Sequence, residues 1–530
     1  MPLALPGQRV CERRPHRAVL AADQQIDVGD FVAVTVERLT NEHRHLCLLV
    51  KCALLPAMGR MTRLPSRGHG PGRILTAVNF WPRRQVRRDR ENTISPHHGN
   101  KSHPLPPERH AFTEPTTGPA AMTEAPTSGR FHAPAAAGPS SALHATPRSL
   151  LILGASTRAW ASSTRRLGLE IHAVDLFADR DLLDIATATP VAPGQFPAAL
   201  ESAAATFPTG PWCYTGALEN HPDVLDAIAA HRPLLGNGGD AVRTARSPRR
   251  LAAVFADRDI VFPRTVDTPS AVPTDGSWLR KPLASAGGLG IAPWTGHADG
   301  RTTDRAMVWQ ERHAGLPVAG VFVVIPGAAR FVGASRQVLG VESWHARPFA
   351  YCGSIDVDPA TLPAPLRDQW QRVGNALADD LGLRGVVGVD AIVAPDGRLV
   401  VIEINPRPSA SMELVDRRTG RPLAADHLGA YGIVTRGGTP SPGGGRWAKG
   451  VLRTRSPLAV DDAMNERLDR LASQWTGADG WPAIADLPRS GTFLPAGAPC
   501  VTLFAVSDTG RKARRILDDR IAIVDRLFTG

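Results

Sequence analysis

Two residues, Asp396 and Gly397, set the strongest constraint on the fold of this chain. They lie in the stretch PDGR, between the apolar segments GVVGVDAIVA and LVVIEIN. Asp-Gly at the two central positions is a strong signal for a two-residue turn between antiparallel strands. With that turn, Asp390 pairs directly with Glu403. The sequence therefore predicts a β-hairpin in which two carboxylates face each other.

The opposite face of this hairpin is apolar. In the same register, Val389, Ala391 and Val393 pair with Ile404, Ile402 and Val400. A slip of one residue would turn this face to solvent and bury the acids, so the pattern specifies the register strongly. We therefore expect the apolar residues to face the core.

The polar face of the hairpin has the composition of a metal site. Two opposed carboxylates destabilise a sheet, and a divalent cation between them reverses that interaction. Oxygen ligands from Asp390, Glu403 and Asn405 suit Mg²⁺, or Mn²⁺, which also accepts phosphate oxygens. Arg407, one step further along this face, can grip a phosphate or carboxylate. A solvated polar face of an edge hairpin is the alternative interpretation.

The net charge of +11 belongs mainly to the N-terminal segment. Residues 1–121 contribute +8 and the remaining residues only +3. Residues 1–146 show no sustained helical or strand period and are rich in Pro, Ala and basic residues, so we expect a mostly disordered extension. It is either a basic arm for nucleic acid or, as we favour, an artefact of the start site, with translation beginning near Met122.

The apolar segments and the cysteines indicate the cellular compartment of the protein. The run HLCLLVKCALLPAM is too short to span a bilayer and lacks the layout of a secretory signal. The six cysteines are scattered, without zinc-ligand spacing or a disulfide framework. We therefore expect a protein of the reduced cytoplasm without a membrane segment.

Residues 147–238 have the pattern of an open parallel α/β domain. Leu150–Leu153 reads as a strand, Gly154 as a turn, 156–167 as a helix and EIHAVDLF as a second strand. Ligands of such sheets bind at the carboxyl ends of the strands. The turn GAST lacks the second and third glycines of a dinucleotide fingerprint, so the sequence does not predict NAD.

Two further segments follow. Residues 239–435 mix strands and helices in an α+β pattern and include the strand–loop–strand SWLRKPLASAGGLGIAPW. After the stretch RGGTPSPGGG, residues 445–530 form a β-rich module that closes with a basic helix. We expect a fold that combines α/β and α+β segments.

Residues 147–435 resemble the ATP-grasp superfamily of ATP-dependent ligases. Asp390, Glu403 and Asn405 are similar to its metal-binding pattern, and Arg407 matches the arginine of its Asn-Pro-Arg form. The N-terminal part most resembles uncharacterised predicted carboligases related to biotin carboxylase. The resemblance implies an ATP-grasp architecture, with an N-terminal parallel domain, a two-lobed ATP-grasp domain and a small C-terminal module.

The resemblance also implies an ATP site. Lys281 matches the strand lysine that contacts phosphates, and Arg249 or Arg250 lies where a second basic residue often contacts them. The segment Ser285–Gly290 would be the flexible loop over the phosphates and WQERHAG the hinge that meets adenine. The residues implied to bind nucleotide are Lys281, Ser285, Gly287, Gly288, Gly290, Gln310, Glu311 and Arg249, with Gly315 near the hinge.

The implied reaction joins a carboxylate to an amine. The carboxylate attacks the γ-phosphate of ATP and becomes an acyl phosphate, with Lys281 and Arg407 as catalytic residues. Biotin carboxylases have a glutamine and a glutamate where this chain has Ser409 and Ser411, which favours amine ligation over carboxylation with bicarbonate. A nucleotide-binding regulator with a basic nucleic-acid arm is the alternative from another class.

The acceptor side of the site is less specified. Residues 336–337 and 349–354 are expected to line it, although Tyr351 is more typical of a core aromatic. His345 stays unassigned. The expected partners are small-molecule carboxylate and amine substrates, and a homodimer is one option for the assembly; nucleic acid is not favoured.

Overall fold

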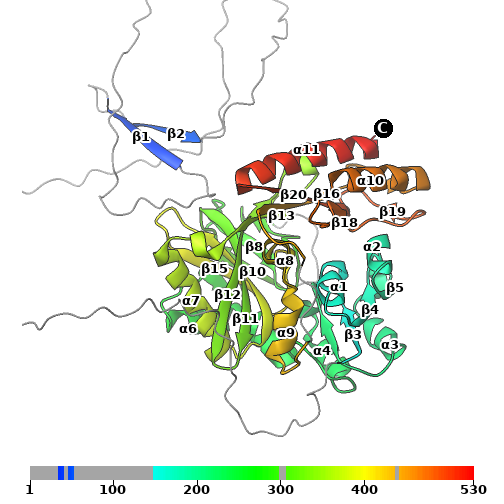
Figure 1. Ribbon diagram of the computed structural model, residues 1–530. Coiled ribbons are helices and arrows are strands. Elements are labelled where there is room, and N and C mark those ends of the chain that lie inside the picture. Colours follow the sequence, from blue (N-terminus) through cyan, green and yellow to red (C-terminus); the bar gives the residue numbers. More distant parts are fainter. Residues whose placement is uncertain (1–33, 41–45, 53–146, 298–305, 436–440, 530) are drawn as a thin grey trace, which may run out of the picture. The chain divides into compact units, whose positions relative to one another are not determined.

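The computed structural model describes residues 34–40, 46–52, 147–297, 306–435 and 441–529 (Figure 1). One compact unit comprises residues 1–54 and 140–530 and contains all of these segments, whereas the other, 55–139, lies outside them. Most of the predicted extension 1–146 is therefore outside the described residues. Within it, β1 (Val34–Thr40) and β2 (Leu46–Cys52) form an antiparallel pair that the sequence pattern did not predict.

We use the name N-terminal domain for residues 149–229, which contain the predicted parallel sheet. Its strands run in the order β5-β4-β3-β6, all parallel. The strands are β3 (Ser149–Leu153), β4 (Glu170–Asp175), β5 (Thr187–Pro190) and β6 (Trp212–Tyr214). The helices are α1 (Arg158–Arg165), α2 (Arg180–Leu183), α3 (Leu200–Ala205) and α4 (Pro222–Ala229), with short turns η1 (Pro193–Gln195) and η2 (Leu218–Asn220). The connection β3–α1–β4 confirms the predicted strand, turn, helix and strand.

A small antiparallel sheet carries the glycine-rich loop. The helices α5 (Gly239–Ala245) and α6 (Pro248–Ala256) precede it. Its strands are β7 (Thr265–Val266), β8 (Trp278–Pro282), β9 (Ala292–Pro293) and β10 (Met307–Glu311), in the order β7-β10-β8-β9. The loop connects β8 to β9, as predicted.

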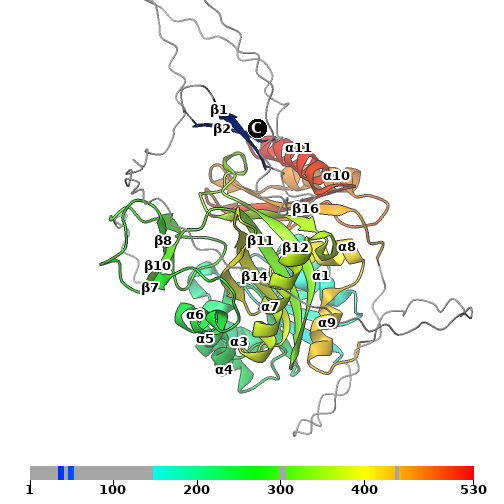
Figure 2. The same cartoon turned by 90° about the vertical axis from the view of Figure 1, so that its left-hand side faces the viewer.

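A larger sheet of eight strands carries the predicted hairpin. Its order is β15-β14-β11-β12-β13-β16-β20-β18, with antiparallel neighbours. The first five strands are β11 (Leu316–Ile325), β12 (Ala328–Leu339), β13 (Tyr351–Val357), β14 (Gly385–Val393) and β15 (Leu399–Asn405). The helix α7 (Ala364–Asp379) covers β11 and β12 on one face (Figure 2), and α8 (Met412–Thr419) and α9 (Leu423–Ala430) lie on the other. The turns η3 (Glu342–Trp344) and η4 (Pro359–Thr361) connect strands and helices.

The C-terminal strands continue this same sheet. They are β16 (Arg446–Arg453), β18 (Ile484–Ala485) and β20 (Pro499–Ser507), and β16 pairs with β13. The helices α10 (Asp462–Trp475) and α11 (Gly510–Thr529) accompany them, and β17 (Leu458–Ala459) pairs with β19 (Phe493–Leu494). Although the sequence boundary at residue 445 stays a prediction, the strands beyond it share one hydrogen-bonded ladder with the strands before it.

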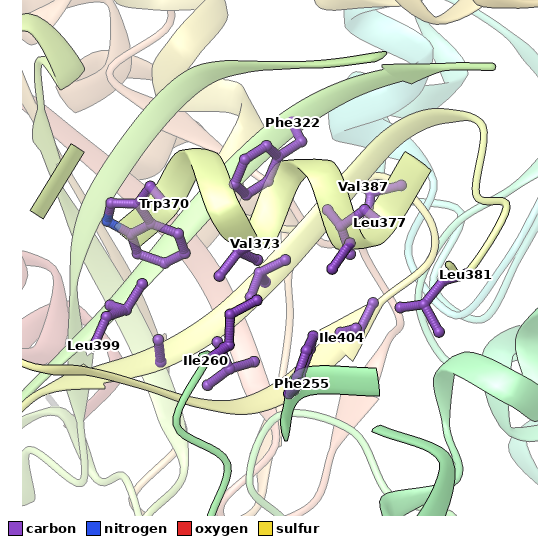
Figure 3. Close-up of a cluster of buried hydrophobic side chains, with 14 of the residues drawn as sticks. Phe255, Ile260, Phe322, Trp370, Val373, Leu377, Leu381, Val387, Leu399 and Ile404 are labelled. Carbon is purple, nitrogen blue, oxygen red and sulfur yellow. The ribbon is translucent and has the colours of Figure 1, made fainter. Parts of the chain in front are cut away.

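The core under the hairpin is aromatic and aliphatic. Trp370 of α7 stacks on Phe331 with ring centroids 5.2 Å apart and contacts Phe322. Figure 3 shows Trp370 and Phe322 in one cluster with Val387 and Ile404, which come from the two hairpin strands. Burying side chains of this size stabilises the fold by about 1.5–3 kcal/mol each. This core therefore fixes the apolar face of the hairpin and, through the pleat, the direction of its polar face.

The hairpin departs from the predicted register in two places. The loop has three residues, because the Ala394 amide donates to the Arg398 carbonyl and the Gly397 amide donates to the Ala394 carbonyl. Gly397 has φ +83°, which is the left-handed position of a three-residue hairpin loop. The two-residue turn was therefore wrong, and near the loop Val393 pairs with Leu399 and Ala391 with Val401.

A β-bulge then restores the predicted pairing at the site. The register shifts between Asp390 and Ala391, so that Ile402 is the extra residue of β15. Beyond the bulge Asp390 pairs with Glu403 and Val389 with Ile404, as predicted. The expected pairing of Ile402 with Ala391 was wrong: Ile402 lines the same cavity as Glu403 instead of facing the core.

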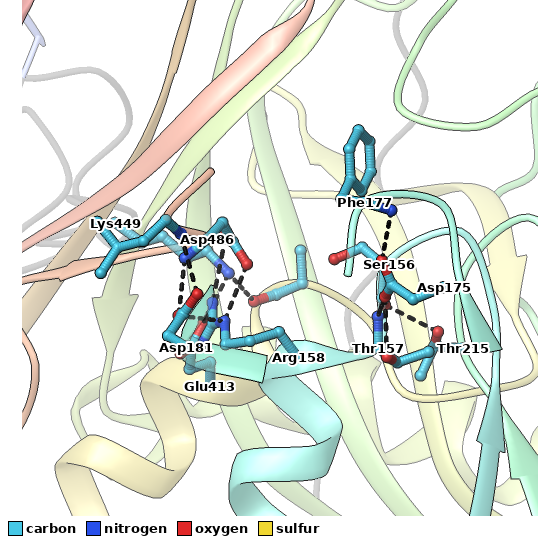
Figure 4. A network of polar contacts seen from close by, with 12 residues as sticks. Ser156, Thr157, Arg158, Asp175, Phe177, Asp181, Thr215, Glu413, Lys449 and Asp486 are labelled. Atoms are coloured by element: carbon cyan, nitrogen blue, oxygen red, sulfur yellow. Dashed lines mark hydrogen bonds and ion pairs between the residues drawn. The ribbon is translucent and has the colours of Figure 1, made fainter. Parts of the chain in front are cut away.

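A buried polar network joins three parts of the chain (Figure 4). Arg158 of α1 donates to Glu413 of α8 at 2.5 Å and to Asp486, in the C-terminal segment, at 2.9 Å. Lys449 of β16 donates to the other Glu413 oxygen at 2.8 Å. Burial opposes ionisation of Glu413, but the charges of Arg158 and Lys449 hold its pKa well below the usual range. The network fixes how these segments meet beside the site.

His427 of α9 forms a second buried link. Its Nε2 donates to the Leu235 carbonyl at 2.9 Å, and its Nδ1 accepts from the Val386 amide of β14 at 3.0 Å. Both nitrogens are used by the neutral ring, and burial lowers the pKa of His427 to about 4.

We expect His427 to make stability fall in acid. Because its pKa is lower in the folded state, its contribution is complete above pH 6.5 and is lost as the pH falls toward 4. Each pH unit across that window costs about 1.4 kcal/mol. Urea unfolding between pH 7 and pH 5 should therefore show a smaller pH dependence for His427→Gln than for the unchanged protein. Equal slopes for the two proteins would contradict this role.

Candidate active site

A cavity of about 540 Å³ lies between the small sheet and the hairpin. Ten of the predicted site residues line it: Lys281, Ser285, Gly287, Gly288, Gln310, Glu311, Asp390, Glu403, Asn405 and Arg407. Gly290 and Arg249 do not. The cavity thus brings together residues from segments up to 126 positions apart in the chain.

The two acids lie in different environments. Gln337 and Asn405 each donate to one oxygen of Asp390, at 2.8 and 3.1 Å. Burial, together with the negative charge of Glu403, raises the pKa of Asp390 to about 7. Burial acts in the same direction on Glu403, but the positive charges of Arg246 and Lys281 lower the pKa of that carboxyl. The pair therefore holds less than two full negative charges near neutral pH unless a cation is added.

The donor set fits a divalent cation. Asp390 and Glu403 are directly opposed, and the pKa of Asp390 is raised. A cation between the two carboxylates would stabilise their ionised forms. Among the described residues, no group of three or more His, Cys, Asp and Glu side chains could hold a metal. A cation here would therefore depend on Asp390, Glu403, the Asn405 amide and oxygens from a ligand, a set typical of Mg²⁺.

Sequence reasoning missed Arg246, which does not line the 540 Å³ cavity but lines a small adjoining one together with Lys281 and Glu403. Arg246 lies at the end of α5, and its guanidinium forms an ion pair with Glu403. Arg249 and Arg250, between which the phosphate contact was left open, are both exposed on α6 and do not line the cavity. The end of α5 directs Arg246 toward the hairpin, whereas α6 directs Arg249 and Arg250 toward solvent. The only sequence signal was the cluster of basic residues in TARSPRR, which does not distinguish its members.

Lys281 is oriented by a chain of polar side chains. Its ammonium donates to Gln310 at 2.9 Å, and Gln310 donates to Thr265 at 3.2 Å. These residues come from the adjacent strands β8, β10 and β7. Burial and the nearby Arg246 lower the pKa of Lys281, whereas Glu403 raises it. A partly desolvated ammonium aimed into the cavity is suited to bind an anion such as phosphate.

The glycine-rich loop lies against β13. Gly288 has φ +77°, and a Cβ atom there would lie 2.0 Å from the Phe349 carbonyl oxygen. The Tyr351 amide donates to the Gly287 carbonyl at 2.9 Å. Gly290 also has a positive φ, but its surroundings are Pro282 and not the cavity. The close approach at Gly288 explains why this position requires glycine.

Arg407 is held by a residue of the N-terminal domain. Its Nη2 donates to Glu219 at 2.5 Å and to Asn405 at 3.2 Å. The second oxygen of Glu219 has no partner among the described residues. Tyr214 and Asn237 donate to the Pro406 carbonyl, at 3.3 and 2.8 Å. No sequence motif pointed to Glu219, because its role depends on how two distant segments meet.

The expected acceptor side is lined by hydroxyl and amide groups. Gln337, Tyr351, Ser354, Ser409 and Ser411 line the cavity, whereas Arg336, which was also expected there, does not. Tyr351 and Ser354 are 3.0 Å apart and Ser409 and Ser411 are 3.2 Å apart, each between hydroxyl oxygens. Tyr351, for which a core position was the more typical expectation, is therefore partly buried and part of the cavity wall.

Other described side chains bear on the remaining sequence predictions. His345, which was left unassigned, lies 2.8 Å from Asp525 and does not line the cavity. Cys213, Cys352 and Cys500 are free and buried. No helix among the described residues is long and apolar enough to cross a membrane.

Two lobes that close on one cavity, one with a lysine and a glycine-rich loop and one with paired acids, define a nucleotide-binding fold. Residues 245–411 match the family model for the ATP-grasp domain. This part of the chain therefore carries an ATP-grasp domain, as its sequence predicts.

Relatives agree with this assignment. A stretch of 101 residues is 38% identical to the carbamoyl phosphate synthase large chain of Pasteurella multocida (strain Pm70), covering 19% of this chain and 9% of that relative. The chain therefore spans only a small part of its curated relative's length.

Solved structures share the fold. Carboxyaminoimidazole ribonucleotide synthase from Aspergillus clavatus, complexed with ATP, has a TM-score of 0.54 at 14% identity, covering 72% of this chain and 99% of that chain. The biotin carboxylase domain of Hydrogenobacter thermophilus 2-oxoglutarate carboxylase has a TM-score of 0.53 at 12% identity, covering 73% and 95%. At these identities the structures show a shared fold.

Arg246 and Arg249 should differ in their effect on nucleotide affinity. Loss of one charged hydrogen-bonding group facing phosphate costs about 1.5–3 kcal/mol, or roughly 10-fold or more in affinity. We expect that weakening for Arg246→Gln and no change for Arg249→Gln, measured by calorimetric titration with Mg²⁺-ADP. Equal weakening by both substitutions would contradict the placement of Arg246 in the site.

Proposed function

We propose that the protein is an ATP- and Mg²⁺-dependent ligase that activates a carboxylate and joins it to an amine. The observation that carries this proposal is the pairing of Asp390 with Glu403 in one cavity with Lys281 and Arg407. Asp390, Glu403 and Asn405 would hold Mg²⁺, and the bound cation would offset the negative charge of the phosphates. We also propose that Lys281 contacts the phosphates of the nucleotide and that Gln310 and Glu311 contact the nucleotide.

The residues of this chain have separate tasks in the proposed reaction. Lys281 binds the phosphates and offsets the charge that moves as the γ-phosphoryl group is transferred. The carboxylate oxygen forms a bond to the γ-phosphorus while the bond to the bridging oxygen of ADP breaks. Arg407, held in position by Glu219, binds the resulting acyl phosphate through its guanidinium.

The second step forms the amide. The amine nitrogen attacks the acyl carbon, phosphate leaves with the electrons of the carbon–oxygen bond, and the nitrogen passes a proton to the departing phosphate. The glycine-rich loop, packed against Phe349 and Tyr351, limits the access of water to the acyl phosphate. Positioning and electrostatic compensation account for the chemistry, with no need for a covalent enzyme intermediate.

Carboxylation is the second candidate. The similar solved structures include a biotin carboxylase domain in complex with MgADP and bicarbonate. In this chain Ser409 and Ser411 stand where the sequence resemblance implies a glutamine and a glutamate, and both serines line the cavity. The neutral lining supports an uncharged nucleophile over an anionic one. For the ligase we also propose a cytoplasmic location, with a homodimer as one option for its assembly.

Glu403→Gln should abolish metal-dependent turnover while the fold is retained. Removing one of two opposed carboxylates removes the charge that would bind the cation, and a loss of about 10²–10³ in kcat is typical for one electrostatic group. Phosphate release and circular dichroism measure the two properties. Normal turnover of a folded Glu403→Gln protein with Mg²⁺-ATP would contradict the metal assignment.

The nucleophile can be identified by ADP release over a panel of metabolites. We expect stimulation when a carboxylate and an amine are supplied together and none with ¹⁴C-bicarbonate. Incorporation of the label would support carboxylation instead. Nucleotide binding without turnover over the whole panel would favour a regulator. Removing residues 1–121 should leave the ligase activity unchanged.

A further inference from the structure

Arg246 contacts three separate parts of the site through one guanidinium. Its Nη1 pairs with Glu403 on the hairpin. Its Nη2 lies 3.2 Å from the Asn220 amide oxygen in the N-terminal domain. The same nitrogen lies 3.3 and 3.4 Å from the carbonyls of Leu283 and Ser285, where the glycine-rich loop begins. One side chain therefore joins a proposed metal ligand, a neighbouring domain and the loop.

Asn220 strengthens the hold on the loop. Its amide nitrogen donates to the Ser285 carbonyl at 3.3 Å, while its oxygen accepts from Arg246. At its middle the loop is held again, because the Tyr351 amide donates to the Gly287 carbonyl. The start of the loop thus depends on Asn220 and Arg246, and Asn220 has no contact with Glu403 among the described hydrogen bonds.

The ion pair and a cation compete for Glu403. A guanidinium bonded to a carboxylate oxygen neutralises the charge that would attract a divalent cation. A cation that binds Glu403 repels Arg246 and removes a partner that orients its planar fork. Since such coupling is reciprocal, the cation weakens the bond between Arg246 and Glu403 by the same factor by which that bond weakens cation binding. Arg246 shares a small adjoining cavity with Lys281 and Glu403, so phosphate groups bound by Lys281 would offer Arg246 a replacement partner.

We propose that Arg246 is a positioning residue that couples the glycine-rich loop to the metal seat, so that a cation binds Glu403 well only when nucleotide phosphates accept Arg246. This inference rests on the proposed metal seat of Asp390 and Glu403. It adds an order to binding: the cation enters with the nucleotide and not ahead of it.

Binding of Mn²⁺ alone tests the competition. Free Mn²⁺ is measured by electron paramagnetic resonance with no nucleotide present. Arg246→Gln should bind Mn²⁺ about tenfold or more tightly than the unchanged protein. Arg246→Lys, which keeps the charge but loses the fork, should lie between them. Arg258→Gln is the matched control, because Arg258 pairs with Asp379 and Asp380 outside the cavity and should alter nothing.

Hydrogen exchange of the loop tests the coupling. In Arg246→Gln and Asn220→Ala, the peptide that covers residues 283–291 should exchange several times faster than in the unchanged protein. Asn220→Ala removes one partner of Arg246 but keeps its pair with Glu403, so it should change Mn²⁺ affinity less than Arg246→Gln does. Mn²⁺ added to the unchanged protein should accelerate exchange of the same peptide, and Mg²⁺-ADP should slow it.

The outcomes separate this inference from the proposed function. If Arg246→Gln binds Mn²⁺ no more tightly than the unchanged protein, or if its loop exchanges at the same rate, the coupling is refuted while the ligase proposal stands. If Glu403→Gln leaves Mn²⁺ binding unchanged, the metal seat itself is refuted, and the proposed function loses its main support.

Discussion

The opposition of Asp390 and Glu403 is the constraint on which the rest of the site depends. Two carboxylates on paired residues are unfavourable in a sheet, and burial increases that cost. The apolar core under the hairpin nevertheless holds them in place, because any other register would expose Val389 and Ile404. The unfavourable pair is stabilised by surrounding donors and is therefore ready to accept a cation.

The groups that compensate these acids come from four segments. Arg246 lies at the end of α5, Lys281 on β8, Gln337 on β12 and Arg407 just after β15. The N-terminal domain adds Glu219, which orients Arg407. A buried charge is tolerated only with well-placed partners, so the relative placement of these segments is part of the chemistry. The polar network around Arg158 and the link through His427 fix that placement from outside the cavity.

Local patterns predicted the elements of the site better than its assembly. The strand–turn–helix opening, the glycine-rich loop and the acid pair each depend on residues close in sequence, and each was found. The pairing of Asp390 with Glu403 was predicted with a turn one residue too short, and the bulge at Ile402 cancelled that error. A bulge depends on how the strand bends over its neighbours, which the alternation of residue types does not encode.

Side chains that act across domains were beyond the reach of the sequence. Arg249 and Arg246 are three residues apart, on successive short helices, and only the direction of each helix decides which one meets Glu403. Glu219 and Asn220 lie in a short turn with no motif of their own. Such residues become visible only when the two domains are placed together.

The charge balance of the acceptor end bears on the nature of the nucleophile. Arg407 is the cation there, and its charge is already offset by Glu219. Asp390 and Glu403 lie on the same polar face, while the other nearby groups are the hydroxyls of Ser409 and Ser411. Because Glu219 offsets Arg407, an anionic nucleophile would find no uncompensated cation among these groups, whereas an amine would meet acceptors for its hydrogens. This balance favours an amine over bicarbonate, in agreement with the loss of the glutamate that the carboxylase pattern would require at position 411.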